Sequence, residues 1–273
     1  MARGLVLFAL MTVAISCSTI EEDRKGCPCW YKIDFSQVDT QIEKLYLWFF
    51  DQQGNPLLMD TLYSSRYGDI YEVELKRGTV GFHVWGNVLE NTTLESPHAS
   101  EPFLKKGEGS QADPLYSYSK VLDTWREDGN DVVFVKREYA DLDIVLKGGT
   151  VQGSGFWIKL DCGTSGRYID GRFLEEGISL VAETSADSNG YSAKFRLLRQ
   201  KSLARLKMSV GSSEKAESYI IEDFPIGELM LGSGYDMDAD NLQDIMVVVD
   251  VSAGRIILCT EDWKTVIYVD VRL

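Results

Sequence analysis

Apolar and polar residues alternate with a period of two through most of this 273-residue chain, and helical periodicity is scarce. In the segment EKLYLWFF, for example, Leu45, Leu47 and Phe49 fall on one side of an extended strand. Successive side chains of a strand point to opposite faces, so this pattern predicts sheets with one buried face. The chain is therefore expected to be all-β.

Turn residues divide the first half of the chain into hairpins. The first is expected over residues 43–63, turning between Asp51 and Pro56. The second is expected over residues 70–88, turning at Arg77-Gly78. Glycine and polar residues between two alternating runs are the usual signal for such turns.

Residues 90–129 are rich in Ser, Pro, Glu and Gly and predict a long excursion between strands, with one short helix over residues 117–126. Loops of that length are often functional. Residues 217–231 are ambiguous between a strand and a short helix. Further strands are expected within residues 131–149, 154–163, 193–199, 203–210, 244–259 and 264–273.

Many short strands with glycine-rich turns favour β-sandwiches, and the restart of the pattern after Gly148-Gly149 favours two of them. The expected organisation is a signal segment, a short acidic tether and two tandem sandwich domains. Their expected bounds are 1–16, 17–27, 28–148 and 149–273.

The chain begins with one charge, Arg3, and an apolar run from Leu5 to Ile15 that is too short to span a bilayer as a helix. Small residues, Ala14 and Ser16, stand three and one positions before Cys17. This start resembles a bacterial lipoprotein signal, in which cleavage precedes a cysteine that is then acylated. Two or more acyl chains, at about 0.8 kcal/mol per buried methylene, make a stable anchor. The alternative is an ordinary signal peptide with an incidental cysteine.

The stretch STIEEDRK after Cys17 is expected to be a flexible acidic tether. Acidic residues at this place resemble the surface-export signal of Bacteroidetes lipoproteins. The resemblance implies a lipid-anchored protein on the outside of the outer membrane.

The formal net charge is −14, from 28 basic and 42 acidic residues, and no basic cluster offsets it. Such a surface repels the phosphate backbone, so nucleic acid is not expected as a partner. The two histidines, His83 and His98, are too few for a histidine-rich zinc site, and a catalytic triad would have to use one of them. No two carboxylates stand out as a catalytic pair, so neither an enzyme activity nor a cofactor is expected.

Four cysteines remain besides Cys17: Cys27, Cys29, Cys162 and Cys259. The C-x-C spacing is too tight for a relaxed disulfide, and no second close pair completes a metal site. A bridge from either member of that pair to a distant cysteine stays open.

The acidic run over residues 236–244 invites comparison with a calcium loop. An EF-hand needs Gly at the sixth position and Glu at the twelfth, where this chain has Asn241 and Val247. A solvated acidic loop is favoured and no metal site is predicted. Of the six tryptophans, four lie in or beside expected strands, where core packing is the default, and Trp125 is the freest candidate for a glycan contact.

Several stretches together resemble the FimB/Mfa2 family of Bacteroidetes fimbrial anchor lipoproteins. They are the lipoprotein start, the acidic spacer before Cys27-Pro28, YKIDFSQVDTQIEKLYLWFFDQQGN, VELKRGTVGFHVWGN and the C-terminal run with Trp263 before its last strand. Residues 90–130 and 150–200 match by position only. Cys29, directly after the Cys-Pro pair, departs from the usual pattern of the family.

The resemblance implies two transthyretin-like β-sandwiches and a role at the base of a fimbria. The protein would hold the polymer to the outer membrane through acylated Cys17, limit its length, and join a fimbrial shaft subunit by β-strand complementation. The final strand, residues 264–273, is expected to leave no long C-terminal donor extension. Two alternatives remain: a surface glycan-binding lipoprotein of a polysaccharide-uptake system, and a fimbrial tip adhesin of the same fold.

Overall fold

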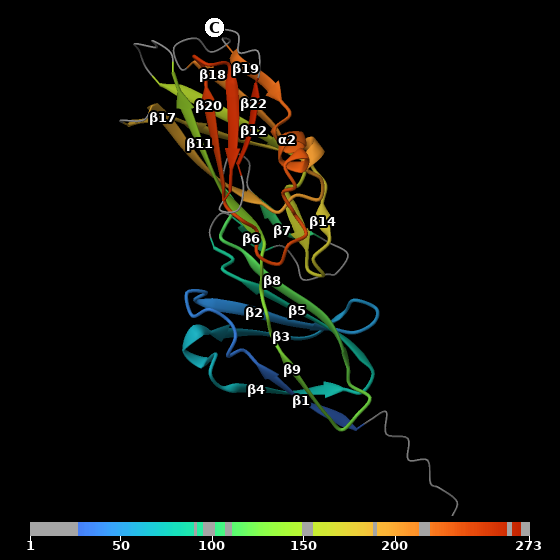
Figure 1. Cartoon of the computed structure of the whole chain (residues 1–273). Helices are drawn as coiled ribbons and strands as arrows, with labels where there is room; N and C mark the ends of the chain where they lie inside the picture. Colours follow the sequence, from blue (N-terminus) through green and yellow to red (C-terminus); the bar gives the residue numbers. More distant parts are fainter. Residues whose placement is uncertain are drawn as a thin grey trace, which may run out of the picture.

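The computed structural model describes residues 27–89, 92–94, 102–106, 111–148, 155–187, 190–212, 219–260 and 264–268. It is built almost wholly of strands, so the all-β prediction is confirmed, while the transthyretin-like topology stays a prediction. The strands form two stacked sandwiches joined end to end (Figure 1). The signal segment, Cys17 and most of the tether lie outside the described residues.

The first sandwich contains a three-stranded sheet of order β4-β1-β9 and a five-stranded sheet of order β10-β8-β5-β2-β3. The bounds are β1 Pro28–Asp34, β2 Lys44–Phe50, β3 Pro56–Tyr63, β4 Ile70–Lys76, β5 Thr79–Gly86, β8 Tyr116–Asp123, β9 Asp128–Val132 and β10 Lys136–Arg137, with a 3₁₀ turn, η2, at Ser64–Arg66. Their inner faces enclose one apolar core, at whose centre Phe49 and Phe82 stack with ring centroids 4.6 Å apart.

The second sandwich contains a six-stranded sheet of order β16-β17-β11-β20-β21-β22 and a four-stranded sheet of order β15-β12-β18-β19. The bounds are β11 Tyr139–Lys147, β12 Phe156–Cys162, β15 Ile178–Glu183, β16 Ser185–Asp187, β17 Gly190–Leu198, η3 Leu203–Arg205, β18 Lys207–Ser212, β19 Tyr219–Phe224, α2 Ile226–Gly232, β20 Ile245–Asp250, β21 Arg255–Cys259 and β22 Lys264–Tyr268. A separate apolar core fills this sandwich.

A small four-stranded sheet of order β14-β13-β7-β6 lies between the sandwiches (Figure 1). Its bounds are β6 Thr92–Leu94, β7 Pro102–Lys106, β13 Gly166–Tyr168 and β14 Phe173–Leu174. It pairs a segment from each half of the chain, since β7 is hydrogen-bonded to β13.

The first predicted hairpin is confirmed by the pairing of β2 with β3. Leu45, Leu47 and Phe49 are all buried. The turn is organised by Asp51, whose carboxylate accepts hydrogen bonds from the backbone and the side-chain amide of Asn55 at 2.8 and 2.9 Å. The local sequence therefore encodes both the strands and the turn.

The second predicted hairpin is wrong, because β4 and β5 belong to different sheets. β4 pairs with β1, whereas β5 pairs with β2 and β8. The chain crosses the sandwich at Arg77-Gly78, and the Thr124 hydroxyl ties the crossing by donating to the Lys76 carbonyl at 2.7 Å. Alternation places each strand's apolar face toward the core, but it does not state which strand supplies the hydrogen bonds.

The helix predicted over residues 117–126 is also wrong. The segment forms β8, which pairs along its whole length with β5. A complete backbone ladder with β5 overrides the weak helical pattern of the isolated segment. The ambiguous segment over residues 217–231 resolves into β19 followed by α2, with Pro225 between them.

The pairing of β11 bears on the predicted boundary between the domains, after residue 148, which stays a prediction. β11 is hydrogen-bonded to β17 and β20, and its apolar residues pack in the second core. We therefore propose the boundary between β10 and β11 instead of after residue 148. Within the part of the chain that the structure describes, no helix is long and apolar enough to cross a membrane.

Truncating Phe82 to Ala is expected to lower the free energy of unfolding by about 3–5 kcal/mol, because it opens a cavity beside Phe49 in a fully buried site. Val121→Ala on the neighbouring β8 is the control: Val121 is 68% exposed and its truncation should change that free energy by less than about 0.5 kcal/mol. Urea unfolding followed by fluorescence measures both. Equal losses in the two variants would contradict the assigned core.

Candidate interaction surfaces and the joint between the sandwiches

The joint between the sandwiches has an apolar core of its own. Trp48 and Phe50 of β2 and Trp85 of β5 cover the outer face of the five-stranded sheet, where they pack with Ile169 and Leu198 from the other half of the chain. The Trp85 indole Nε1 also donates a hydrogen bond to the Ile169 carbonyl at 3.2 Å. The first sandwich therefore uses both faces of this sheet, one for its core and one for the joint.

A buried ion triad sits beside this apolar contact. The Glu138 carboxylate accepts hydrogen bonds from Arg167 and, at 3.2 Å, from Nε of Arg199. The Ser117 hydroxyl donates to its other oxygen at 2.6 Å. All three charged residues are at least 94% buried, Arg167 being 2% exposed. Two guanidiniums share one carboxylate, so the site carries a net positive charge inside the protein.

Backbone carbonyls accept further hydrogen bonds from the two arginines, although Nε of Arg167 is buried without a hydrogen-bond partner. Arg199 donates to the carbonyls of Arg137 and Met237, and Arg167 donates to the Gly171 carbonyl at 2.9 Å. Burial lowers the pKa of Arg167 to about 10, and the neighbouring Glu138 carboxylate opposes this effect. The guanidinium therefore stays cationic at neutral pH.

The acidic run over residues 236–244 closes the joint from the second sandwich. The Arg137 amide donates to the Asp240 carbonyl at 3.0 Å, and its guanidinium donates to the Leu242 carbonyl at 3.0 Å and to the Asp244 carboxylate at 2.6 Å. The cation that this loop binds is therefore the guanidinium of Arg137. Across the described residues, no group of three or more His, Cys, Asp or Glu side chains is placed to hold a metal ion.

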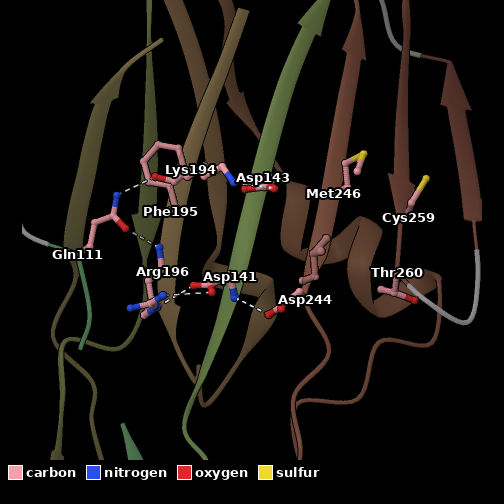
Figure 2. Close-up of a pocket in the computed structure, with 11 residues that line it drawn as sticks. Gln111, Asp141, Asp143, Lys194, Phe195, Arg196, Asp244, Met246, Cys259 and Thr260 are labelled. Atoms are coloured by element: carbon pink, nitrogen blue, oxygen red, sulfur yellow. Dashed lines mark hydrogen bonds and ion pairs between the residues drawn. The ribbon is translucent and has the colours of Figure 1, made fainter. Parts of the chain in front are cut away.

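A polar groove of about 670 Å³ runs along the outer face of the six-stranded sheet, next to the joint (Figure 2). Arg196 makes two hydrogen bonds to Asp141, at 2.7 and 3.2 Å, and Lys194 lies 3.6 Å from Asp143. Gln111 reaches in from the first half of the chain and bonds to the backbone of β17 at 2.7 and 3.0 Å. These charges neutralise one another in pairs, which suits a protein contact surface better than catalysis.

No disulfide joins any two of the four cysteines that the structure describes. Cys29 lies in the first core and Cys162 in the second, which keeps these two apart. Cys27 is exposed and Cys259 is half-buried in the wall of the groove. Burial raises the pKa of the Cys29 thiol, so this side chain is a neutral core residue.

The tryptophans divide into buried and exposed groups. Trp48 and Trp85 are buried in the joint, whereas Trp125, in the bend between β8 and β9, is 54% exposed. Trp30 on β1 is equally exposed, a feature that the sequence pattern did not single out. Trp263 lies outside the described residues.

Among the described strands, the two sheets of the first sandwich end in four edge strands, β3, β4, β9 and β10, of which β3 and β4 are long enough to offer a seven- or eight-residue edge. β3 is the last strand of the five-stranded sheet and β4 the last of the three-stranded sheet among the described strands. Leu58, Met59, Tyr63 and Ile70 on these strands are exposed. An unpaired strand edge is a template for a further strand.

The sequence was compared with known protein families. The family model described as fimbrillin-A associated anchor proteins Mfa1 and Mfa2 matches residues 26–269, nearly the whole chain. The chain belongs to this anchor-protein family. The resemblance seen in the sequence is thereby confirmed, and no curated protein matches the chain individually.

Solved structures of similar fold come from species of Porphyromonas and Bacteroides. The fimbrial anchor protein Mfa2 from Porphyromonas gingivalis has a TM-score of 0.68 at 13% identity, covering 87% of this chain and 99% of that one. A candidate adhesin from Bacteroides ovatus has a TM-score of 0.65 at 11% identity, covering 89% and 96%. A candidate polysaccharide-binding protein from Bacteroides thetaiotaomicron has a TM-score of 0.63 at 12% identity, covering 88% and 98%. At these identities, the likeness shows that this chain and the three solved proteins share a fold.

The sequence pattern did not point to the ion triad of this anchor-family protein. Glu138 lies in a basic run before β11, Arg199 in another after β17, and Arg167 in a glycine-rich segment. Each resembles an ordinary charged residue at a strand end. The one sequence signal for Glu138 and Arg199 is that their charged runs lie directly beside strands of the core.

Glu138→Gln is expected to lower the free energy of unfolding by about 3–5 kcal/mol, because it leaves two buried guanidiniums without a carboxylate. Asp143→Asn is the control, since its pair with Lys194 is exposed and contributes at most about 1 kcal/mol. Chemical denaturation measures both variants. A loss for Glu138→Gln no larger than that of the control would overturn the structural role given to the triad.

Protonation of the His83 imidazole is expected to make the stability of the fold depend on pH. The imidazole contacts Phe50 with ring centroids 5.8 Å apart and bonds to the Ser119 hydroxyl at 2.8 Å, and burial lowers its pKa from 6.5 to about 4. Between these values the unfolded chain binds a proton that the folded chain does not, so stability falls as pH falls. His83→Gln should lose less stability than the parent between pH 7 and 4.5. Parallel slopes for the two proteins in pH-dependent urea unfolding would refute this assignment.

Proposed function

We propose that this protein is the structural anchor at the base of a fimbria. It is held to the outer membrane by acylated Cys17, joins a shaft subunit by strand complementation, limits the length of the polymer and performs no catalysis. Membership of the anchor-protein family, matched over residues 26–269, already associates the chain with fimbriae and the cell surface. The placement of β1 supports the more specific role.

β1 follows the tether directly and is the middle strand of its sheet. All seven of its residues pair with β4, and five of them also pair with β9. Cys29, Tyr31 and Ile33 point into the first core and are buried. A pull on the tether along the strand therefore loads two hydrogen-bond ladders and a set of core contacts together.

This arrangement makes retention of β1 essential to the anchor. Removing the strand would strip the middle from the three-stranded sheet and expose the core beneath it, whereas keeping it leaves the first sandwich complete. A subunit that keeps this strand stays covalently joined to its lipid. The free edges of β3 and β4 remain as templates for a partner strand.

Protease sites inserted at two positions test the anchor. Cleavage in the tether, between Arg24 and Gly26, should release fimbriae into the medium, because it separates the lipid from β1. The matched control carries the site in the β2–β3 turn, at Gln53-Gly54, where the cut ends stay paired within the sheet. Fimbriae are counted on cells and in the medium after protease is added. Fimbriae that stay attached after complete tether cleavage would overturn the anchoring role.

Deletion of the gene should also give fimbriae that are longer and shed, if the protein ends the polymer. Mass spectrometry of the mature N-terminus supplies the chemical control: acylated Cys17 joined to β1 is expected. A mature chain that begins after Phe35 would identify a polymerising subunit instead. The tip-adhesin and glycan-binding alternatives stay predictions.

A further inference from the structure

Two exposed indoles lie at the end of the first sandwich where β1 begins. Trp30 and Trp125 are each 54% exposed, whereas Trp48 and Trp85 are buried. The two are neighbours in the fold, because the Trp30 amide donates at 2.9 Å to the carbonyl of Glu127, two residues after Trp125. We call this surface the tryptophan pole.

The backbone that presents Trp125 is firmly held. Thr124 is fully buried and its hydroxyl bonds to the crossing between β4 and β5. The Trp125 amide donates to the Asp123 carboxylate at 3.1 Å, and the largely buried guanidinium of Arg77 donates to the Trp125 carbonyl at 3.1 Å. The loop that carries Trp125 is therefore fixed by hydrogen bonds, and its indole is exposed although the apolar core is close by.

The position of the pole relates it to the membrane anchor. Cys17 and Cys27 are ten positions apart in the sequence. At no more than about 3.6 Å per residue, the tether keeps Cys27, the residue before β1, within about 36 Å of the acylated residue. Figure 1 shows β1 beginning at the end of the molecule remote from the second sandwich. The pole thus lies at the tethered end of the molecule, within reach of the bilayer that holds the lipid, an argument that rests on the proposed anchoring.

The chemistry of the pole fits the headgroup region of a bilayer. An indole combines an apolar ring with an N–H donor, and tryptophan is enriched at membrane–water interfaces for this reason. Glu74 and Asp128 flank Trp30 in the sheet register, so the pole is not basic and does not attract anionic lipid by charge. Carboxylates stay in water, which limits the contact to shallow insertion of the rings.

We propose that Trp30 and Trp125 insert into the headgroup region of the membrane that carries the lipid anchor. An acyl tether alone leaves the protein free to rotate about one point. A second, aromatic contact fixes the end of the rod against the surface and directs the second sandwich away from the bilayer, where a fimbria extends.

Tryptophan fluorescence on vesicles tests this contact without relying on acylation. A chain that starts at Ser18 with an N-terminal hexahistidine tag is held on phosphatidylethanolamine vesicles containing nickel-chelating lipid, with or without lipids brominated near the headgroup. The brominated lipids should quench part of the emission. That quenched part should fall by roughly half in Trp30→Phe and in Trp125→Phe, and vanish in the double variant.

Trp157→Phe is the matched control, because Trp157 lies on β12 of the second sandwich and should contribute none of the quenched emission. The proposal would be overturned if the parent protein emitted equally with and without brominated lipid. It would also be overturned if the double variant were quenched as much as the parent. An emission change caused by soluble polysaccharide in the absence of lipid quenching would overturn it too, since this marks a glycan site. Failure of the anchoring role is recognised separately, by an unacylated Cys17 in the mature protein.

Discussion

One buried carboxylate, that of Glu138, joins several chain segments at the joint between the two sandwiches. Glu138 stands just before β11 and binds Arg167, from the small sheet at the joint, and Arg199, from the end of β17. Three chain segments therefore meet at one acidic group. Burying two guanidiniums is tolerable only while the carboxylate is present, so the ion triad specifies a single arrangement of these segments. The apolar contact of Trp85 with the other half of the chain adds area to the same joint.

The joint and β1 together describe a continuous mechanical path. In the proposed anchoring role, tension on the residues before β1 would enter that strand, pass through two strand ladders into the first core, and reach the second sandwich through the outer face of β2 and β5. The loop that contains Asp240 and Asp244 reinforces this path by binding Arg137. The proposed role, holding a polymer to a cell, needs such a path.

The limits of prediction from sequence are visible in particular strands. The β2–β3 hairpin was predicted because Asp51 and Asn55 make its turn locally. The Arg77-Gly78 crossing was mistaken for a hairpin, because alternation reports which face is buried and not which strand is the partner. β8 was mistaken for a helix, because its strand state depends on β5, more than thirty residues earlier. Trp30 is exposed because β1 places its side chain on the outer face of the sheet. This was not predicted from the sequence, because core packing is the default for a tryptophan in a strand.

The all-β class, the buried faces of most strands, the family and the expectation of a lipid at Cys17 could all be predicted from the amino-acid sequence. These follow from side-chain periodicity, local turn chemistry and short linear motifs, which act between neighbouring residues. Strand partnership, the Glu138–Arg167–Arg199 triad and the location of Trp30 and Trp125 at one pole become visible only in the folded chain. Those features join residues 29, 61 and about 100 positions apart, so they arise only when long-range backbone pairing brings the segments together.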